Sequence, residues 1–136
     1  MAPIRLEVDL AEITRLNLWL DDHPDRPTLS QANFDDIKLC LNEIVANAIS
    51  YGFPDGAQGG KIDVNLGVQE DRAVAIVTDN GIAFDPLAAP VQPPITDIET
   101  AQVGGFGLML VRKTASQLSY KREGNQNQLT MIFEIA

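Results

Sequence analysis

Two neighbouring strand-like segments, joined by a short turn, most constrain the fold of this chain. Residues 61–68 alternate apolar and polar side chains, which is typical of a strand with one buried face. Residues 72–78 are more continuously apolar, which indicates a central strand. Glu70-Asp71 joins the two segments, so we predict an antiparallel hairpin.

Helical spacing of apolar residues predicts a second layer. One helix is predicted to start at Asp9, with Glu12 three residues later as in a capping box. A longer helix is predicted from an N-cap at Asn33 to Gly52, and a third follows the glycines of residues 104–107. The apolar stripes of the first two are Leu10, Ile13, Leu16, Trp19 and Leu20, and Phe34, Ile37, Leu41, Ile44, Val45 and Ala48.

Three further segments complete the predicted strands. Residues 3–8 alternate, and residues 119–122 and 128–135 flank a turn at Glu123-Gly124-Asn125. Strands paired as hairpins, with helices set apart from them, indicate one layer of each. We therefore predict a single α+β domain over residues 1–136, a two-layer sandwich whose mixed, mostly antiparallel sheet carries three helices on one face. The first strand is predicted to be an exposed edge suited to pairing with a second copy.

Composition disfavours several classes of function. The formal net charge of −9 argues against nucleic acid and anionic membranes as partners, because phosphate binding needs clustered Lys and Arg. No apolar run is long enough for a membrane span and no signal peptide is visible, so a cytoplasmic protein is expected. Cys40 and His23 are each the single residue of their type. His23 is predicted to lie exposed in a loop, which disfavours Ser-His-Asp catalysis.

Two polar residues stand at the edge of the apolar face of the long helix. Glu43 and Asn47 are four positions apart, so their side chains are neighbours on a helix. A carboxylate there could accept a proton or orient a hydroxyl, and an amide oxygen suits Mg²⁺. The same pair is compatible with an ordinary polar rim.

The segment VTDNGIAFDP follows the predicted central strand. Asp79 ends that strand, and Gly81 comes two residues later. A carboxylate at a buried strand end can accept a hydrogen bond from a ligand amine, and a glycine lets a flat ring approach the backbone. Asp-Asn-Gly is also good turn chemistry, so a simple turn is the alternative.

A long loop and a glycine run come next. Residues 86–102 hold four prolines and show no sustained period, which in a small domain indicates a functional or disordered loop. Gly104, Gly105 and Gly107 then precede a helix, where free N–H groups can bind phosphate. A flexible hinge with a helix cap is the alternative.

These segments, in this order, resemble the GHKL superfamily of ATP-binding domains, which have the Bergerat fold. LNEIVANAISYGF is similar to the N box, TDNGIAFDP to the G1 box and GGFGLMLV to the G2 box. The loop at about residues 85–104 resembles the ATP lid, and the likeness covers most of the chain. It is greatest to the stand-alone anti-sigma-factor serine/threonine kinases, because the G1 box reads Asp-Asn-Gly-x-x-Phe-Asp-Pro and the N box has Glu43.

The resemblance implies a role for each matched residue. Glu43 would be the general base toward a serine hydroxyl of a partner protein, and Asn47 would bind the Mg²⁺ that bridges the phosphates of ATP. Asp79 would accept a hydrogen bond from the adenine amino group, with Gly81 allowing the ring to lie close. The phosphates would be held by Gly105, Gly107 and the N–H groups at Leu108.

The chain departs from the family pattern at three points. Tyr51-Gly52 stands where His-Gly often follows the N box, and Ala83 stands at a second glycine of the G1 box. No Lys or Arg lies between Asp85 and Gly104, so the lid offers no cation to the γ-phosphate. Arg112 and Lys113 come later, on the helix.

We therefore expect an ATP- and Mg²⁺-dependent serine/threonine protein kinase that acts as an anti-sigma regulator. It would bind a sigma factor, phosphorylate an antagonist protein, and form a homodimer, without direct contact with nucleic acid or membrane. The alternative within the same fold is a non-catalytic ATP/ADP-binding module that regulates a partner by sequestration. An α+β protein that binds no nucleotide is a third possibility.

Overall fold

The alternating segments form the strands that their patterns predict. The computed structural model describes residues 3–87 and 103–135, and for residues 103–106 the backbone alone. The elements are β1 (Ile4–Leu6), α1 (Glu12–Asp21), the short 3-10 helix η1 (Arg26–Thr28), α2 (Gln31–Tyr51), β2 (Ile62–Gln69), β3 (Arg72–Asp79), α3 (Val103–Thr114), β4 (Gln117–Glu123) and β5 (Gln126–Glu134). Neighbouring strands pair antiparallel in the order β1-β2-β3-β5-β4, so the described sheet is wholly antiparallel and not mixed.

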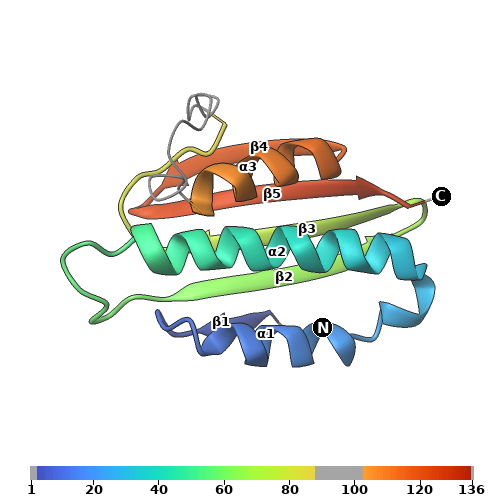
Figure 1. Ribbon diagram of the computed structural model, residues 1–136, viewed down its shortest axis with the longest axis horizontal. Coiled ribbons are helices and arrows are strands. Elements are labelled where there is room, and N and C mark those ends of the chain that lie inside the picture. Colours follow the sequence, from blue (N-terminus) through green and yellow to red (C-terminus); the bar gives the residue numbers. More distant parts are fainter. Residues whose placement is uncertain (1–2, 88–102, 136) are drawn as a thin grey trace.

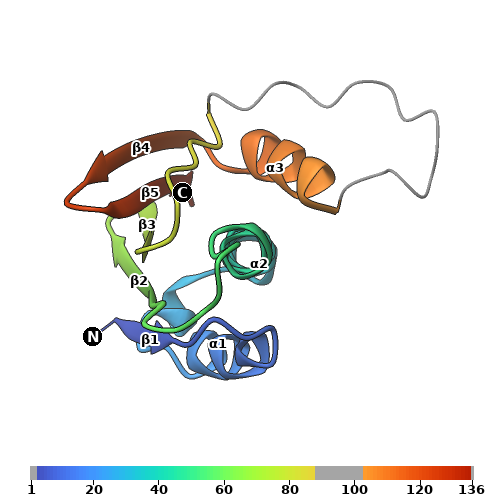
Figure 2. The same cartoon turned by 90° about the vertical axis from the view of Figure 1, so that its left-hand side faces the viewer.

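The two layers follow from where the apolar residues of each strand point. Figure 2 shows the sheet as one layer with α1, α2 and α3 on one face, which confirms the predicted α+β architecture. The central strands bury every second residue under the helices: Ile62, Val64 and Leu66 of β2, Ala73, Ala75 and Val77 of β3, and Leu129, Met131 and Phe133 of β5. The helix α2 runs along the middle of the sheet (Figure 1) and closes this core with six buried residues of its own.

The ends of α2 are set by a serine and a glycine. Ser30 is the N-cap, and its hydroxyl accepts a hydrogen bond from the Asn33 backbone N–H at 3.1 Å. The prediction that Asn33 caps the helix is wrong, because its side chain instead donates to the Ile135 carbonyl at 3.2 Å. Gly52 ends the helix as predicted, and a side chain there would collide with the Ala48 carbonyl.

The predicted start of α1 is also wrong. The Asp9 carboxylate accepts from the Ala11 N–H at 2.9 Å and makes a local turn, so the helix begins at Glu12. Glu12 does not complete a capping box, since it accepts from the Glu7 N–H at 2.9 Å. Leu10 is therefore outside the helix and 57% exposed, although Leu16 is fully buried as expected.

His23 is buried and not exposed as predicted. The side chain is 3% accessible and packs edge-on against the Trp19 ring, with 5.1 Å between ring centroids. Its Nδ1 accepts from the Asp25 N–H at 3.0 Å, so the proton lies on Nε2, which donates to the Leu66 carbonyl at 3.0 Å. The Asp25 carboxylate also accepts from the Val68 N–H at 3.0 Å. His23 and Asp25 thus tie the connection between α1 and α2 to the part of β2 beyond its pairing with β1.

Two side chains of α1 bond to the backbone at β1 and just after it. Arg15 donates to the Arg5 carbonyl, and Glu12 accepts from the Glu7 N–H. Glu12 and Arg15 also form an ion pair at 2.7 Å. β1 is an edge strand of the described sheet, as predicted, and these contacts use the Arg5 carbonyl and the N–H of Glu7, the residue after the strand.

The third helix includes the glycines that were predicted to precede it. It begins at Val103, which places Gly104, Gly105 and Gly107 inside its first turns. Residues 88–102 of the lid predicted at about residues 85–104 lie outside the described residues. The structure describes its base at residues 85–87 and its exit at the start of α3.

Candidate functional site

A cavity of about 170 Å³ lies where the C-terminal end of α2 meets the ends of the central strands. That is room for one flat ring, since an engineered cavity of about 150 Å³ holds benzene. Three of the residues predicted for a site line it, namely Asn47, Asp79 and Leu108. The remaining walls are mostly apolar and come from α2, β3, β4, β5 and the loop after β3: Ile44, Ala48, Tyr51, Gly52, Val77, Ile82, Phe84, Pro86, Tyr120, Asn127 and Leu129.

The Asp79 carboxylate is fixed by its neighbours at the end of β3. Its Oδ1 accepts from the Gly81 N–H and from the Asn127 Nδ2, both at 2.9 Å. Among the described residues, both donors to this carboxylate bond to Oδ1. Oδ2 can therefore accept a hydrogen bond from a ligand in the cavity. A carboxylate acceptor at one end of an apolar slot suits a flat ring that carries an amino group.

Asn127 holds this arrangement together, and it is a residue that the sequence reasoning missed. It stands opposite Asp79 in the β3–β5 register and is 6% exposed. Besides its bond to Asp79, Nδ2 donates to the Ile82 carbonyl at 2.7 Å, and Oδ1 accepts from the Phe84 N–H at 3.3 Å and the Tyr120 hydroxyl at 2.5 Å. All four hydrogen-bonding positions of the amide are therefore used. The missed signal was a polar residue at an inward position of QNQLTMIF, in step with Leu129 and Met131.

Gly81 is required by the protein backbone itself. A side chain there would collide with the Gly52 carbonyl at 2.5 Å, because the end of α2 and the turn after β3 pack directly together. The same carbonyl accepts from the Ile82 N–H at 2.8 Å. The structure thus assigns Gly81 a role beside the cavity, in joining two of its walls, whereas the predicted role was close approach of a ring.

Glu43 and Asn47 lie on the flank of α2, as the helical spacing predicts. Asn47 lines the cavity, and Glu43 lies one turn before it, outside the lining residues. A methyl group on Gly107 would overlap the Glu43 carboxylate, so α3 packs closely on this side chain. The structure therefore brings Asn47 and Asp79 to one cavity and places Glu43 at its α3 side.

The start of α3 contributes to the site in a different way from that expected. Only the N–H groups of the N-cap and of the first three helical residues lack intrahelical partners, and here those helical residues are 103–105. Gly105 is among them. Gly107 and Leu108 lie further in, so a phosphate contact through their N–H groups would require the first turn of α3 to open. Leu108 instead presents its side chain to the cavity.

Cys40 lies on the same flank of α2 and is fully buried. Burial, with Asp36 nearby, raises the pKa of the thiol to about 12. A thiol in this state stays protonated at neutral pH, so it is not a nucleophile for the site.

The chemistry of the donor set decides what kind of metal the site can hold. Among residues 3–87 and 103–135, no group of three His, Cys, Asp or Glu side chains is arranged to hold an ion. Mg²⁺ usually keeps several waters and is bound by one or two protein oxygens plus substrate phosphates. The Asn47 amide oxygen at the cavity fits that pattern. It could therefore be a ligand for a Mg²⁺ that arrives with a nucleotide.

Comparison with known proteins agrees with the fold. Residues 6–133 match the family model of the histidine kinase-like ATPase domain. The chain is 33% identical over 129 residues to the serine/threonine-protein kinase BtrW of Bordetella bronchiseptica, covering 94% of this chain and 89% of that one. It is 25% identical over 126 residues to the serine-protein kinase RsbW of Staphylococcus epidermidis, covering 89% and 79%.

Solved structures of low sequence identity share the fold. The RsbU and RsbW domains of Rv1364c from Mycobacterium tuberculosis superpose with a TM-score of 0.68 at 14% identity, over 99% of this chain and 32% of that one. The catalytic domain of the histidine kinase ThkA gives 0.56 at 17% identity, over 99% and 97%. In the described part of this chain no helix is both long and apolar enough to span a membrane. With the family model covering nearly its whole length, the chain belongs to the histidine kinase-like ATPase domain family, on the branch of the RsbW and BtrW serine kinases.

Proposed function

We propose that this protein binds ATP in the cavity at the C-terminal end of α2 and transfers the γ-phosphoryl group to a serine or threonine of a partner protein. The observation that carries the proposal is the Asp79 carboxylate, fixed through Oδ1 and open at Oδ2, at the end of an apolar slot whose rim holds Asn47. Adenine is a flat ring with an exocyclic amine and fits such a slot. The names of the relatives support kinase activity over simple binding.

Each residue has a part in the proposed reaction. Asp79 accepts from the adenine amine, which orients the nucleotide along α2 toward Asn47. Asn47 supplies an amide oxygen to the Mg²⁺ carried by the phosphates, and Gly105 lies in the helix start whose free N–H groups favour a negative group. Glu43 accepts the proton of the attacking hydroxyl. Phosphoryl transfer depends mainly on positioning and on charge stabilisation, so this set is nearly sufficient.

The regulatory role that we propose rests on the likeness to the RsbW and BtrW kinases. We infer an anti-sigma regulator that binds a sigma factor, is antagonised by a protein it phosphorylates, and works in the cytoplasm. The family resemblance also implies a homodimer.

One observation favours the alternative of a non-catalytic nucleotide-binding module. Glu43 lies against Gly107 of α3, outside the lining of the cavity. For Glu43 to meet a hydroxyl at the γ-phosphate, α3 must shift at its start. A module that only senses ATP or ADP would not need that shift.

A phosphorylation assay decides between the two. The purified protein, Mg-ATP and a candidate antagonist protein should yield phosphoserine or phosphothreonine, detected by mass spectrometry. Glu43→Gln should bind ADP like the wild type and phosphorylate at least about 100-fold more slowly, the usual scale of general base catalysis. ATP binding without any phosphorylation of the antagonist would leave the sensing module as the correct function.

A further inference from the structure

The loop after β3 forms one wall of the cavity but has little core packing of its own. Ile82, Phe84 and Pro86 line the cavity at alternate positions, as in an extended chain. Ile82 is 50% exposed and Phe84 is 42% exposed. Apolar burial therefore contributes little to the position of this wall, and its hydrogen bonds must hold it.

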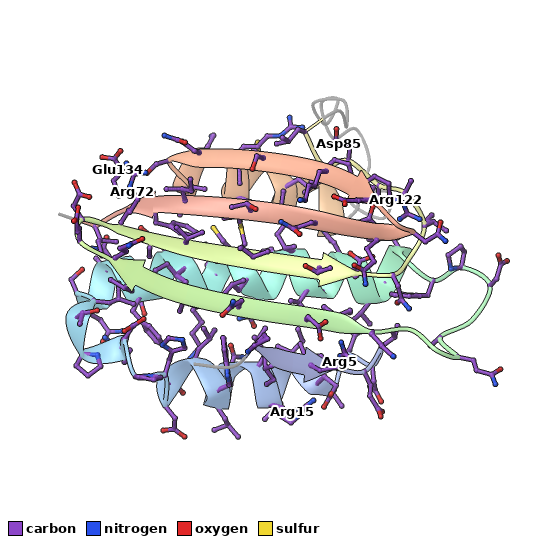
Figure 3. All side chains as sticks on the ribbon, turned by 180° about the vertical axis from the view of Figure 1, so that it is seen from behind. Arg5, Arg15, Arg72, Asp85, Arg122 and Glu134 are labelled. Atoms are coloured by element: carbon purple, nitrogen blue, oxygen red, sulfur yellow. The ribbon has the colours of Figure 1, made fainter. Side chains whose placement is uncertain are left out.

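Arg122 holds the beginning of this loop from β4. Its Nη1 donates to the Gly81 carbonyl at 2.8 Å. Figure 3 shows Arg122 at the same end of the sheet as Asp85, while Arg72 and Glu134 mark the opposite end. A guanidinium is always charged at physiological pH, so this is a charge-assisted bond to a neutral carbonyl.

Arg112 holds the end of the described loop from α3. Its Nη2 donates to the carbonyl of Pro86, a buried residue of the wall. Asn127 and the Gly52 carbonyl fix Ile82 between these two points. The wall is thus attached at its start to β4, in its middle to β5 and α2, and at its end to α3.

We infer that Arg112 and Arg122 are positioning residues that hold the Ile82–Pro86 wall of the nucleotide cavity in its ligand-binding position. The inference rests on the proposed function, because it concerns the affinity of that cavity. For Arg112 the inference concerns the bond that its guanidinium donates to the Pro86 carbonyl at the end of this wall.

The chain supplies a matched control for each arginine. Lys113 follows Arg112 on α3, Lys121 precedes Arg122 on β4, and both lysines are exposed. Replacing either lysine by alanine removes the same charge from the same element without removing a bond to the loop. Any loss of general electrostatic attraction for ATP will appear in the lysine variants as well.

The experiment compares Arg112→Ala and Arg122→Ala with Lys113→Ala and Lys121→Ala. Calorimetric titration with Mg-ADP should show affinity about fivefold weaker for each arginine variant and within about twofold of wild type for each lysine variant, the scale of one lost hydrogen bond. With ATP and antagonist, KM should rise while kcat at saturation stays unchanged. Amide hydrogen exchange at Phe84, whose N–H bonds to Asn127, should become faster in the arginine variants. Thermal melting confirms that all four are folded.

Three results separate the possibilities. Equal ADP affinity in each arginine variant and its lysine control, with unchanged exchange at Phe84, overturns the inference. A fall in kcat at unchanged ADP affinity would show that Arg112 acts on the phosphates and also overturns it. Wild-type protein that binds no ADP would refute the proposed function instead, and the Phe84 exchange rates would then decide whether the arginines hold the loop.

Discussion

Two connections of this molecule are tied to the sheet by the same kind of bond and yet differ in what they leave exposed. In the connection between α1 and α2, His23 bonds to the Leu66 carbonyl and is itself 3% accessible. In the loop after β3, Asn127 bonds to the Ile82 carbonyl, while Ile82 stays 50% exposed. The two regions lie at opposite ends of α2 (Figure 1), whose 21 residues span about 30 Å.

The difference shows how hydrogen bonds to backbone can serve two purposes. Around His23 the anchor and the residue it bonds to, Leu66, are both buried, so the bonds complete the fold along the part of β2 beyond β1. Around Asn127 the anchor is buried but the apolar side chains it positions are not. Exposed apolar groups held in place by buried polar ones are what a ligand pocket needs before its ligand arrives.

The largest expected effect is at Asn127, which should affect both stability and binding. Asn127→Ala leaves the Ile82 carbonyl, the Phe84 N–H and the Tyr120 hydroxyl without their partner. We expect a loss of about 3 kcal/mol in the free energy of unfolding, measured in urea. ADP affinity should also fall at least about tenfold, because Asp79 and the wall lose their common support. Gln128→Ala, the next residue on β5, points to the other face of the sheet and should change neither quantity by much. If Asn127→Ala lost stability but kept normal ADP affinity, the loop after β3 would not differ in function from the connection between α1 and α2.

A smaller and purely structural effect is expected at His23. His23→Ala deprives the Leu66 carbonyl and the Asp25 N–H of their partner and removes the ring that packs on Trp19. The free energy of unfolding should fall by about 2 kcal/mol, while ADP affinity stays at the wild-type value. Asp22→Ala, an exposed neighbour, is the control. Weakened ADP binding in His23→Ala would show that the two ends of α2 are coupled.

The smallest effect belongs to an anchor that is neither buried nor near the cavity. The Arg15 guanidinium and the Glu7 N–H lower the pKa of Glu12 from 4.5 to about 2. Since the folded pKa is depressed, this stabilisation is complete above pH about 4.5 and disappears as the pH falls toward about 2. Solvent screening limits it to about 0.5–1 kcal/mol. Glu12→Gln should therefore be slightly less stable than wild type at pH 7, and the difference should shrink below pH 4.5 in urea titrations. A difference that does not change with pH would rule out a charge effect.

The parts of this fold that could be predicted from sequence depend on local periodicity. Alternation located the hairpin of β2 and β3, and helical spacing located α2 and its end at Gly52. The helix starts were less certain because several capping residues stand close together. Ser30 and Asn33 are three positions apart, and which of them caps is decided by the Asn33 bond to Ile135, 102 residues away.

The site shows the same limit. Asn47, Asp79 and Leu108 could be predicted, because each belongs to a motif with its own local pattern, and the structure brings them to one cavity. Asn127 and the buried state of His23 could not, because their partners lie 48 and 43 residues away in the chain. The arginines that hold the loop were visible as cations, but a sequence does not specify the carbonyl to which a guanidinium points.

The most direct test of a nucleotide site organised by Asp79 is calorimetric titration with Mg-ADP of wild type and Asp79→Asn. Wild type should bind with one site per chain. Asp79→Asn should lose at least about 30-fold in affinity, because an amide replaces a charged acceptor and its NH₂ can be turned against the Gly81 N–H or the Asn127 amide. No binding by wild type, or equal affinity in the variant, would contradict an adenine site at this carboxylate.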